Sequence, residues 1–284
     1  MKAAVIQKVT RNLPLPGRIV RRLIKFLDKY IKYPDTPTIS TAHWGMGQYE
    51  ITNYREYSQQ SIYFLGYYEL RESKLLRRLL RPGDIFVDIG ANLGWFTVLA
   101  CKQIGDKGKV FAFEPSASVW TKLNRSIEIN NLRNVKPENL ALSDETGTVL
   151  LSGAIPENSG LSSIVRTNQQ SLITAGEQVP VIKFDDYWKR ELNQKVRLIK
   201  IDVEGAEVKV LDGMRSILQN RLCDYLIVEI SDDRLRCLGM SASWALNFLR
   251  GCGYKLFHIG MFRLKPIEDD EELHYANILA ELRP

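Results

Sequence analysis

From residue 84 onward the sequence alternates between short apolar runs and longer amphipathic segments. The apolar runs predict strands over residues 85–89, 109–113, 135–142, 198–202, 225–230, 255–258 and 276–281. The segments between them predict helices over residues 93–104, 116–130, 206–219 and 243–250. Strands that alternate with helices of this length form a parallel sheet with helices on both faces. We therefore expect an α/β fold whose ligand site lies beyond the carboxyl ends of the strands.

Two other regions precede this α/β part. In residues 1–37, the stretch 18–33 predicts an amphipathic helix with apolar side chains on one face and Lys and Arg on the other. Residues 38–82 are rich in aromatic side chains and predict a small subdomain or lid that ends in a helix over 68–80. We therefore expect a basic extension, an aromatic-rich part and a catalytic domain over 83–284.

The positive charge of the chain is concentrated in the extension. Residues 1–35 carry nine Lys and Arg against two Asp, a net charge of +7, whereas the whole chain has +6. The remaining residues are therefore almost neutral. Enzymes that act on nucleic acid usually carry positive charge around the catalytic cleft. The residues after 35 lack this positive charge, and no Asn/Asp-Pro-Pro-Tyr segment occurs in the chain. Nucleic acid is therefore not an expected partner.

The sequence also bears on the cellular compartment. No apolar run approaches the roughly 18–20 residues that a spanning helix requires, and the first residues lack the apolar core of a secretory signal. The four cysteines are far apart and form no CxxC pair, which argues against a disulfide framework and a zinc site. We expect a cytoplasmic protein, and the sequence predicts no oligomeric state.

The strongest local motif is a glycine turn between a predicted strand and a predicted helix, with the sequence FVDIGANLGW. Gly90 and Gly94 allow a tight turn and the close approach of a ligand to the backbone. A dinucleotide site would need glycine at positions 92 and 95, where this chain has Asn92 and Trp95. S-adenosylmethionine has no pyrophosphate and tolerates bulk at these positions, and its ammonium group suits a carboxylate such as Asp88. The turn therefore indicates S-adenosylmethionine rather than a dinucleotide.

Further candidate cofactor residues follow the next two strands. Glu114 ends the second strand, about 20 residues after the glycine turn, where an acidic residue accepts hydrogen bonds from both ribose hydroxyls. Ser143 or Asp144, after the third strand, is placed to bond the adenine amino group, although Ser-Asp is equally a common turn pair.

Candidate catalytic residues lie farther along the same edge. Asp202 ends a buried strand, Glu204 follows it, and Glu229 lies near the end of the next strand. An alcohol acceptor needs a base to remove its proton, which a buried carboxylate or a histidine such as His258 can do. An oxygen-rich metal site at these carboxylates is conceivable, but nothing fixes their spacing, and no metal is predicted.

The motifs VDIGANLG, VFAFEP, ALSD, SGLSSI, IKIDVEGAE and VLDG occur in this order. Through them the chain resembles the FkbM family of S-adenosylmethionine-dependent methyltransferases over roughly residues 65 to 260. The resemblance implies the class I methyltransferase fold, a Rossmann-like, mainly parallel sheet with helices on both faces. It also implies that S-adenosylmethionine is the cofactor, and that members methylate hydroxyls of sugars, glycans and polyketides.

The resemblance assigns roles by position. The methionine-side loop is matched by Asp88, Gly90, Asn92 and Gly94. Glu114 matches the ribose carboxylate, and Asp202 and Glu204 match the segment near the acceptor. Glu69 matches an acidic residue that helps close the methionine end.

These observations favour an O-methyltransferase acting on a hydroxyl of a sugar, a glycan or a related small molecule. One alternative is a methyltransferase for a polyketide or other natural-product hydroxyl. Another is a catalytically silent module that keeps the fold for docking, which the intact set Asp88, Gly90, Glu114 and Asp202 disfavours.

The basic helix over residues 18–33 has two interpretations. It either docks its apolar face on the catalytic domain, or it lies in the surface of an anionic membrane, at the inner face, and holds the enzyme there. The sequence leaves both open.

Overall fold

The computed structural model describes residues 2–12, 17–152, 164–165, 176–261, 263–269 and 271–283. The entry to the basic helix, with Pro14 and Pro16, lies outside the described residues, as does nearly all of the SGLSSI segment. Among the described residues, none of the helices combines the length and apolarity needed to span a bilayer.

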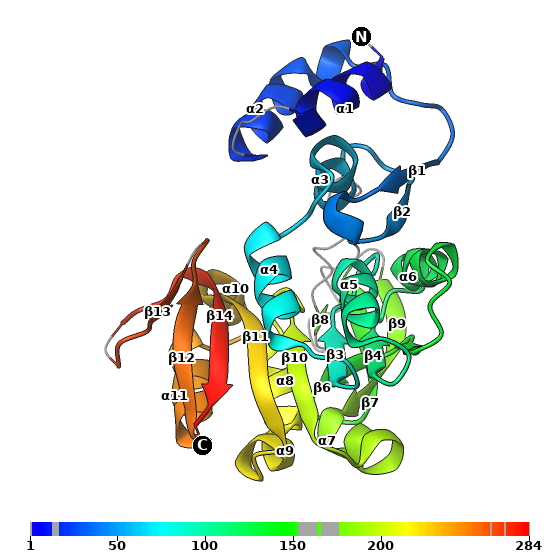
Figure 1. Cartoon of the computed structure of the whole chain (residues 1–284). Coiled ribbons are helices and arrows are strands. Elements are labelled where there is room, and N and C mark those ends of the chain that lie inside the picture. Colours follow the sequence, from blue (N-terminus) through cyan, green and yellow to red (C-terminus); the bar gives the residue numbers. More distant parts are fainter. Residues whose placement is uncertain are drawn as a thin grey trace.

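The core of the molecule is one eight-stranded sheet (Figure 1). In spatial order its strands are β13 (Leu264–Pro266), β12 (Tyr254–Ile259), β14 (Tyr275–Leu282), β11 (Cys223–Ser231), β10 (Val196–Ile201), β3 (Ile85–Ile89), β4 (Lys109–Phe113) and β5 (Val135–Glu138). The five strands from β11 to β5 are parallel, and β14 inserts antiparallel between β11 and β12. This mainly parallel arrangement confirms the predicted α/β class.

Helices cover both faces of the sheet because its strands are apolar on both sides. One face is covered by α4 (Leu70–Leu79), α5 (Trp95–Ile104) and α6 (Ala117–Ile129). The other is covered by α7 (Phe184–Tyr187), α8 (Glu207–Gly213), α9 (Arg215–Gln219) and α11 (Ala242–Gly251), while α10 (Asp232–Cys237) follows β11. We call these the α5 face and the α8 face. Successive residues of a strand point to opposite faces, so Val87 and Ile199 lie on the α8 face, whereas Phe86 and Leu198 lie on the α5 face.

The N-terminal segments cover the α5 face at one end of the molecule (Figure 1). They comprise α1 (Ala3–Asn12), α2 (Gly17–Leu27), a 3₁₀ turn (Asp28–Tyr30), β1 (Thr38–Thr41), β2 (Gln48–Ile51) and α3 (Tyr57–Leu65). Ile24, Tyr49 and Ile62 belong to the same apolar cluster as Leu198 of the sheet. The predicted boundaries at residues 37 and 82 therefore do not separate independent cores.

The predicted helix over 18–33 is too long. The α-helix ends at Leu27, and the chain beyond the 3₁₀ turn is extended because Lys32 pairs with Lys2 and its carbonyl oxygen accepts from the Ala3 amide at 3.0 Å. The helix predicted over 68–80 likewise begins only at Leu70.

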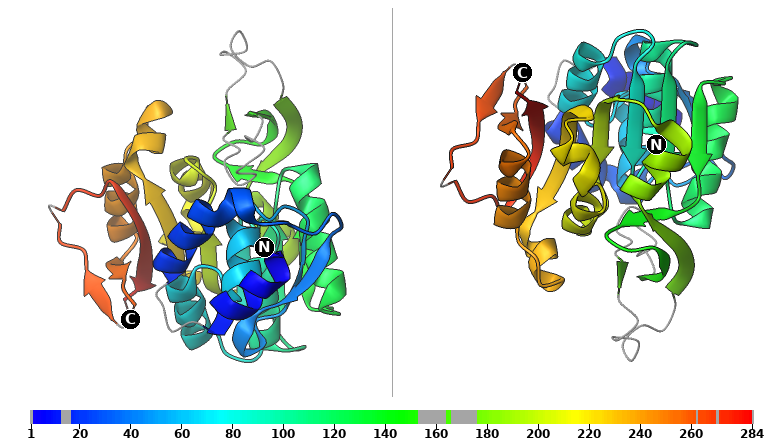
Figure 2. Two further views of the ribbon diagram at one scale, coloured as in Figure 1. Left: turned by 90° about the horizontal axis from the view of Figure 1, so that it is seen from above. Right: turned by 90° about the horizontal axis from the view of Figure 1, so that it is seen from below.

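The sequence analysis missed a second, four-stranded sheet that projects beside the central one (Figure 2). Its order is β6 (Ala141–Ser143), β9 (Gly176–Lys183), β7 (Gly147–Ser152) and β8 (Ile164–Val165). The single strand predicted over 135–142 is therefore wrong, because β5 and β6 belong to different sheets. Between them, the Asn139 side chain donates to the carbonyl oxygens of Glu114 and Pro115, each at 2.9 Å, and this fixes the bend.

The helix predicted over 206–219 is divided into α8 and α9. Gly213, at the end of α8, lies so close to the backbone carbonyl of Ser143 that a Cβ would collide with it.

Candidate functional site

A cavity of about 1000 Å³ lies at the carboxyl ends of β3, β4, β10 and β11. The strand ends contribute Gly90, Glu114, Asp202 and Glu229, and the N-terminal region contributes Glu69. Its size suits a small-molecule ligand. The cavity lies at the edge of the sheet where the sequence predicts the ligand site.

Gly90 forms part of the wall where β3 and β10 end. Its φ of 83° is in the left-handed region, and a Cβ there would collide with the backbone oxygen of Asp202. The Phe113 carbonyl accepts from the amides of Gly90 and Ala91 at 3.0 and 2.9 Å. Glycine is therefore required for both the turn and the approach of the two strands. Gly94 begins α5 with a φ of 91° but does not line the cavity.

Glu114 is held rigidly at the tip of β4. Its Oε2 accepts from the Asn92 amide at 3.0 Å, and its Oε1 accepts from the Ser116 amide at 3.1 Å. Burial raises the pKa of Glu114 to about 7, although both amide hydrogen bonds act in the opposite direction. The carboxylate lines the cavity at the position predicted for a ribose contact.

Glu69 also lines the cavity, immediately before α4. Burial raises its pKa to about 7, although nearby Lys200 opposes the shift. Among the described residues, no hydrogen-bond donor reaches its buried Oε2. A buried acceptor without a donor is costly, and the ammonium group of S-adenosylmethionine would supply one.

Three lining residues other than glycine have left-handed backbone conformations. The φ angles are 39° at Glu69, 51° at Asn92 and 55° at Glu204. Such conformations cost on the order of 1–3 kcal/mol each and concentrate at functional sites. Their presence around one cavity supports its assignment as the active site.

A row of polar side chains crosses the sheet on the α5 face, and three of its members, Lys200, Glu229 and Asn277, line the cavity. Lys200 of β10 lies in register with Asp88 of β3, and Glu229 of β11 with Asn277 of β14. The Lys200 ammonium, 3% exposed, donates to Asp202 Oδ2 at 2.7 Å. Burial alone would lower the pKa of Lys200, but Asp202, Glu69 and Asp88 outweigh it and raise the pKa. Lys200 therefore stays charged and is the central cation of the site.

The structure does not place the Asp88 carboxylate in the cavity lining. Because strand residues alternate between faces, Asp88 points under α5, where its Oδ2 accepts from the Thr97 hydroxyl at 2.6 Å. Burial raises its pKa. Asp88 therefore does not line the cavity, contrary to the prediction that it faces the ammonium group, whereas Glu69 does.

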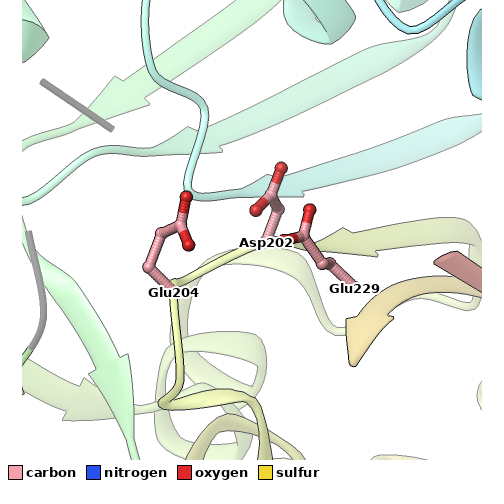
Figure 3. Close-up of side chains that lie close together, drawn as sticks. All are labelled: Asp202, Glu204 and Glu229. Carbon is pink, nitrogen blue, oxygen red and sulfur yellow. The ribbon is translucent and has the colours of Figure 1, made fainter. Parts of the chain in front are cut away.

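Asp202, Glu204 and Glu229 converge, as Figure 3 shows, with one carboxylate oxygen from each within 4.8 Å of the others. Arg234 of α10 forms ion pairs with Glu204 and, at 3.5 Å, with Glu229. Lys200 and Arg234 therefore compensate much of the negative charge of this cluster. The absence of a metal stays a prediction.

Glu229 is a carboxylate with a raised pKa. Burial and the neighbouring charge of Asp202 raise its pKa to about 8, although Lys200 acts in the opposite direction. A hydrogen bond with Glu229 also contributes, after burial, to the raised pKa of the Tyr275 hydroxyl. A carboxylate with this pKa is suited to accept a proton near neutral pH.

Comparison with known proteins identifies the family. The family model described as "Methyltransferase FkbM domain" matches residues 88–256, more than half of the chain. The chain belongs to this methyltransferase family. The match confirms the predicted FkbM resemblance and, with it, the predicted cofactor S-adenosylmethionine. Residues 1–87 lie outside the match.

We compare this FkbM-family methyltransferase with three curated relatives. The names of two of them state an acceptor, and the acceptors differ. Methyltransferase 1 of Beauveria bassiana is 32% identical, over 54% of this chain and 67% of its own length. Hexuronic acid methyltransferase AglP of Haloferax volcanii is 28% identical, over 56% and 62%. The 31-O-demethyl-FK506 methyltransferase FkbM of Streptomyces tacrolimicus is 27% identical, over 54% and 67%. The matches thus span about two thirds of each relative.

Among solved structures, the methyltransferase FkbM of Methylobacillus flagellatus KT is similar, with 15% sequence identity and a TM-score of 0.43. The alignment covers 93% of this chain and 60% of that protein.

Besides Asp88 and Gly94, three further predicted site residues of this FkbM-family methyltransferase do not line the cavity. His258 lies in a neighbouring cavity of about 640 Å³, where its Nε2 is 2.6 Å from Glu271 Oε1. Ser143 donates to Asp144 Oδ1 at 2.9 Å, below the lining formed by residues 140–142. The prediction that His258 is a candidate base is therefore wrong. The prediction that Ser143 or Asp144 contacts the adenine is wrong for the same reason, because neither lines the cavity.

The sequence analysis missed Lys200 and Arg234. Lys200 could have been found, because it is a lone charge within the otherwise apolar strand segment LIKI. Arg234 follows β11 without a motif, and only the fold brings it to Glu204.

Proposed function

We propose that this FkbM-family methyltransferase transfers the methyl group of S-adenosylmethionine to a hydroxyl of a sugar, a glycan or a related small molecule. The observation that carries the proposal is Glu229, a carboxylate with a pKa of about 8 in the same cavity as the cofactor residues. Transfer to oxygen requires a proton acceptor at the hydroxyl, whereas transfer to an uncharged amine does not require one before attack.

The residues that would hold the cofactor are Glu114 at the ribose hydroxyls and Glu69 at the ammonium group. Gly90 lets the ends of β3 and β10 approach each other closely at the cavity wall. The bound cofactor supplies an electrophilic methyl group on a sulfonium. Much of the remaining catalysis consists of holding the acceptor oxygen in line with that methyl group.

Glu229 would take the proton of the acceptor hydroxyl. Asp202 is a weaker candidate for this role, because it already accepts a hydrogen bond from Lys200. We infer that Asp202 acts on the proton transfer indirectly, since its charge raises the pKa of Glu229.

The acceptor class is further narrowed by arginines. Arg18 and Arg21 of α2 and Arg71 of α4 line the cavity, and within the described ranges none of them forms an ion pair with a carboxylate. Arginine recognises carboxylate and phosphate groups through its planar set of donors. This favours an acidic sugar, the kind of acceptor named for the Haloferax relative, over an uncharged natural-product hydroxyl.

The cofactor assignment is tested by replacing Glu114 with Ala. We expect calorimetry to show S-adenosylmethionine binding weakened by about 1.5–3 kcal/mol, the contribution of a charge-assisted pair of hydrogen bonds. Glu145→Ala removes an exposed carboxylate that does not line the cavity and should leave the affinity unchanged. Binding of NAD as tight as that of S-adenosylmethionine, or an unchanged affinity in Glu114→Ala, would contradict the assignment.

A further inference from the structure

Helices α1 and α2 form the outermost layer at one end of the molecule, and both face the viewer when the molecule is seen from above (Figure 2, left). Each helix buries one edge on the protein. In α2, Val20 and Ile24 are each 1% exposed and fix the helix to the α5-face cluster. The helix is therefore docked on the protein, as one of the two interpretations of the sequence predicts.

A second apolar edge of α2 stays exposed. Ile19, Leu23 and Phe26 are 44%, 41% and 75% exposed. Their spacing of four and three residues places them on one side of the helix. We call these three residues the α2 stripe. In α1, Val5 and Val9 are also exposed, at 61% and 53%. Exposed apolar side chains gathered in this way mark an interaction surface.

Cations flank the α2 stripe. Arg22 and Lys25 alternate with it along α2, Lys29 follows in the 3₁₀ turn, and α2 itself contains no acidic residue. In the part of the chain that the structure describes, no carboxylate forms an ion pair with these three cations. The acidic residue that follows α2 in the sequence, Asp28, pairs with Arg55 at 3.0 Å and accepts from the Tyr33 hydroxyl at 2.5 Å. The surface thus combines uncompensated positive charge with apolar side chains.

We propose that this surface docks on an anionic lipid bilayer. An amphipathic helix of this kind lies in the plane of the interface, with apolar side chains at the headgroup boundary and Lys and Arg at the anionic headgroups. A second copy of the chain is a poorer occupant. A symmetric dimer through this surface would bring two segments of net charge +7 together, and that repulsion opposes association.

Docking would also orient the catalytic cavity. Arg18 and Arg21, on the same helix, line that cavity, so the bilayer surface would lie beside its α2 wall. An acceptor carried at the headgroup level would then lie within reach of the site. This orientation rests on the proposed function, whereas docking itself does not.

The test is co-sedimentation of the full chain with vesicles of phosphatidylcholine, with and without phosphatidylglycerol. We expect binding only with phosphatidylglycerol, and weaker binding as sodium chloride is added. The double variant Leu23→Ser/Phe26→Ser should lower the vesicle affinity at least tenfold, because two apolar anchors are lost. The variant Arg22→Gln/Lys25→Gln should lower it by about tenfold or more.

Matched controls separate docking from misfolding. Phe26→Leu keeps an apolar side chain and should retain most of the binding, and Lys107→Gln removes an exposed cation far along the chain and should have no effect. Cofactor binding measured by calorimetry should be unchanged in all four variants, which separates this proposal from the proposed function. Equal binding to neutral vesicles, or no binding to either kind, would overturn the proposal. So would a dimer in light scattering that the stripe variants dissociate, since it would assign the surface to a second copy.

Discussion

Glu229→Gln should lower kcat by roughly 10²–10⁴-fold, the usual contribution of a general base. The substitution keeps the shape of the side chain but removes the group that accepts the acceptor proton. S-adenosylmethionine affinity should stay within a few fold of the wild type, because we propose that Glu114 and Glu69, not Glu229, hold the cofactor. The measurement is steady-state turnover with calorimetry on the same samples. Normal turnover in Glu229→Gln would move the base to Asp202 or Glu204.

The pH dependence of kcat/KM is a second test of Glu229 as the general base. The pKa of Glu229 is about 8, and the group is a base only when ionised. We therefore expect kcat/KM to rise with pH below about 8 and to level off above it. Asp202→Asn removes a negative charge that raises the pKa of Glu229, so the midpoint should move to lower pH. A midpoint that stays in place in Asp202→Asn would contradict the coupling of these two carboxylates.

Lys200→Met should lower the free energy of unfolding by about 3–5 kcal/mol, the cost of leaving buried charges without their partner. Lys200 is the cation that compensates Asp202, Glu69 and Asp88. Without it, burial and mutual repulsion should raise the pKa of Glu69 and Asp88 further. A carboxyl with a raised pKa in the folded state stabilises the fold at low pH and loses that contribution as pH rises through the folded-state value. The loss in free energy of unfolding caused by Lys200→Met should therefore become smaller as the pH is lowered.

Urea denaturation at several pH values measures this effect. Lys195→Met is the matched control, because Lys195 also pairs with an aspartate, Asp224, but its side chain is 53% exposed. An exposed ion pair contributes at most about 1 kcal/mol. If the two variants lose the same stability, the buried cation does not have the role inferred here.

The central strands could be predicted from the sequence because their residues are apolar on both faces. The bounds predicted for β3 and β4, 85–89 and 109–113, are those of the structure. The second sheet could not be predicted in this way, since part of its β9 alternates exposed and buried residues and pairs with segments distant in sequence. The split between β5 and β6 depends on the Asn139 side chain, whose partners only the fold brings near.

For the candidate site, the sequence predicts where a residue lies along a strand but not which groups its side chain contacts. A motif placed Asp88 correctly along the strand, but the face to which it points depends on the pairing with β10 and on α5. Glu114 was predictable, because the end of its strand and the following Pro115 define its position. Lys200 could have been noticed as a lone charge in an apolar strand, but its role could not, because only the fold brings near it the carboxylates that it compensates.

Methyl transfer itself tests the account most directly. The protein is incubated with methyl-labelled S-adenosylmethionine and with paired acceptors, a uronic acid glycoside and the corresponding neutral glycoside. The labelled products are identified by nuclear magnetic resonance. We expect the label on a hydroxyl oxygen, more product from the acidic acceptor, and loss of product in Glu229→Gln while cofactor binding persists. Label found on nitrogen or carbon, or product formed at the wild-type rate by Glu229→Gln, would contradict the account.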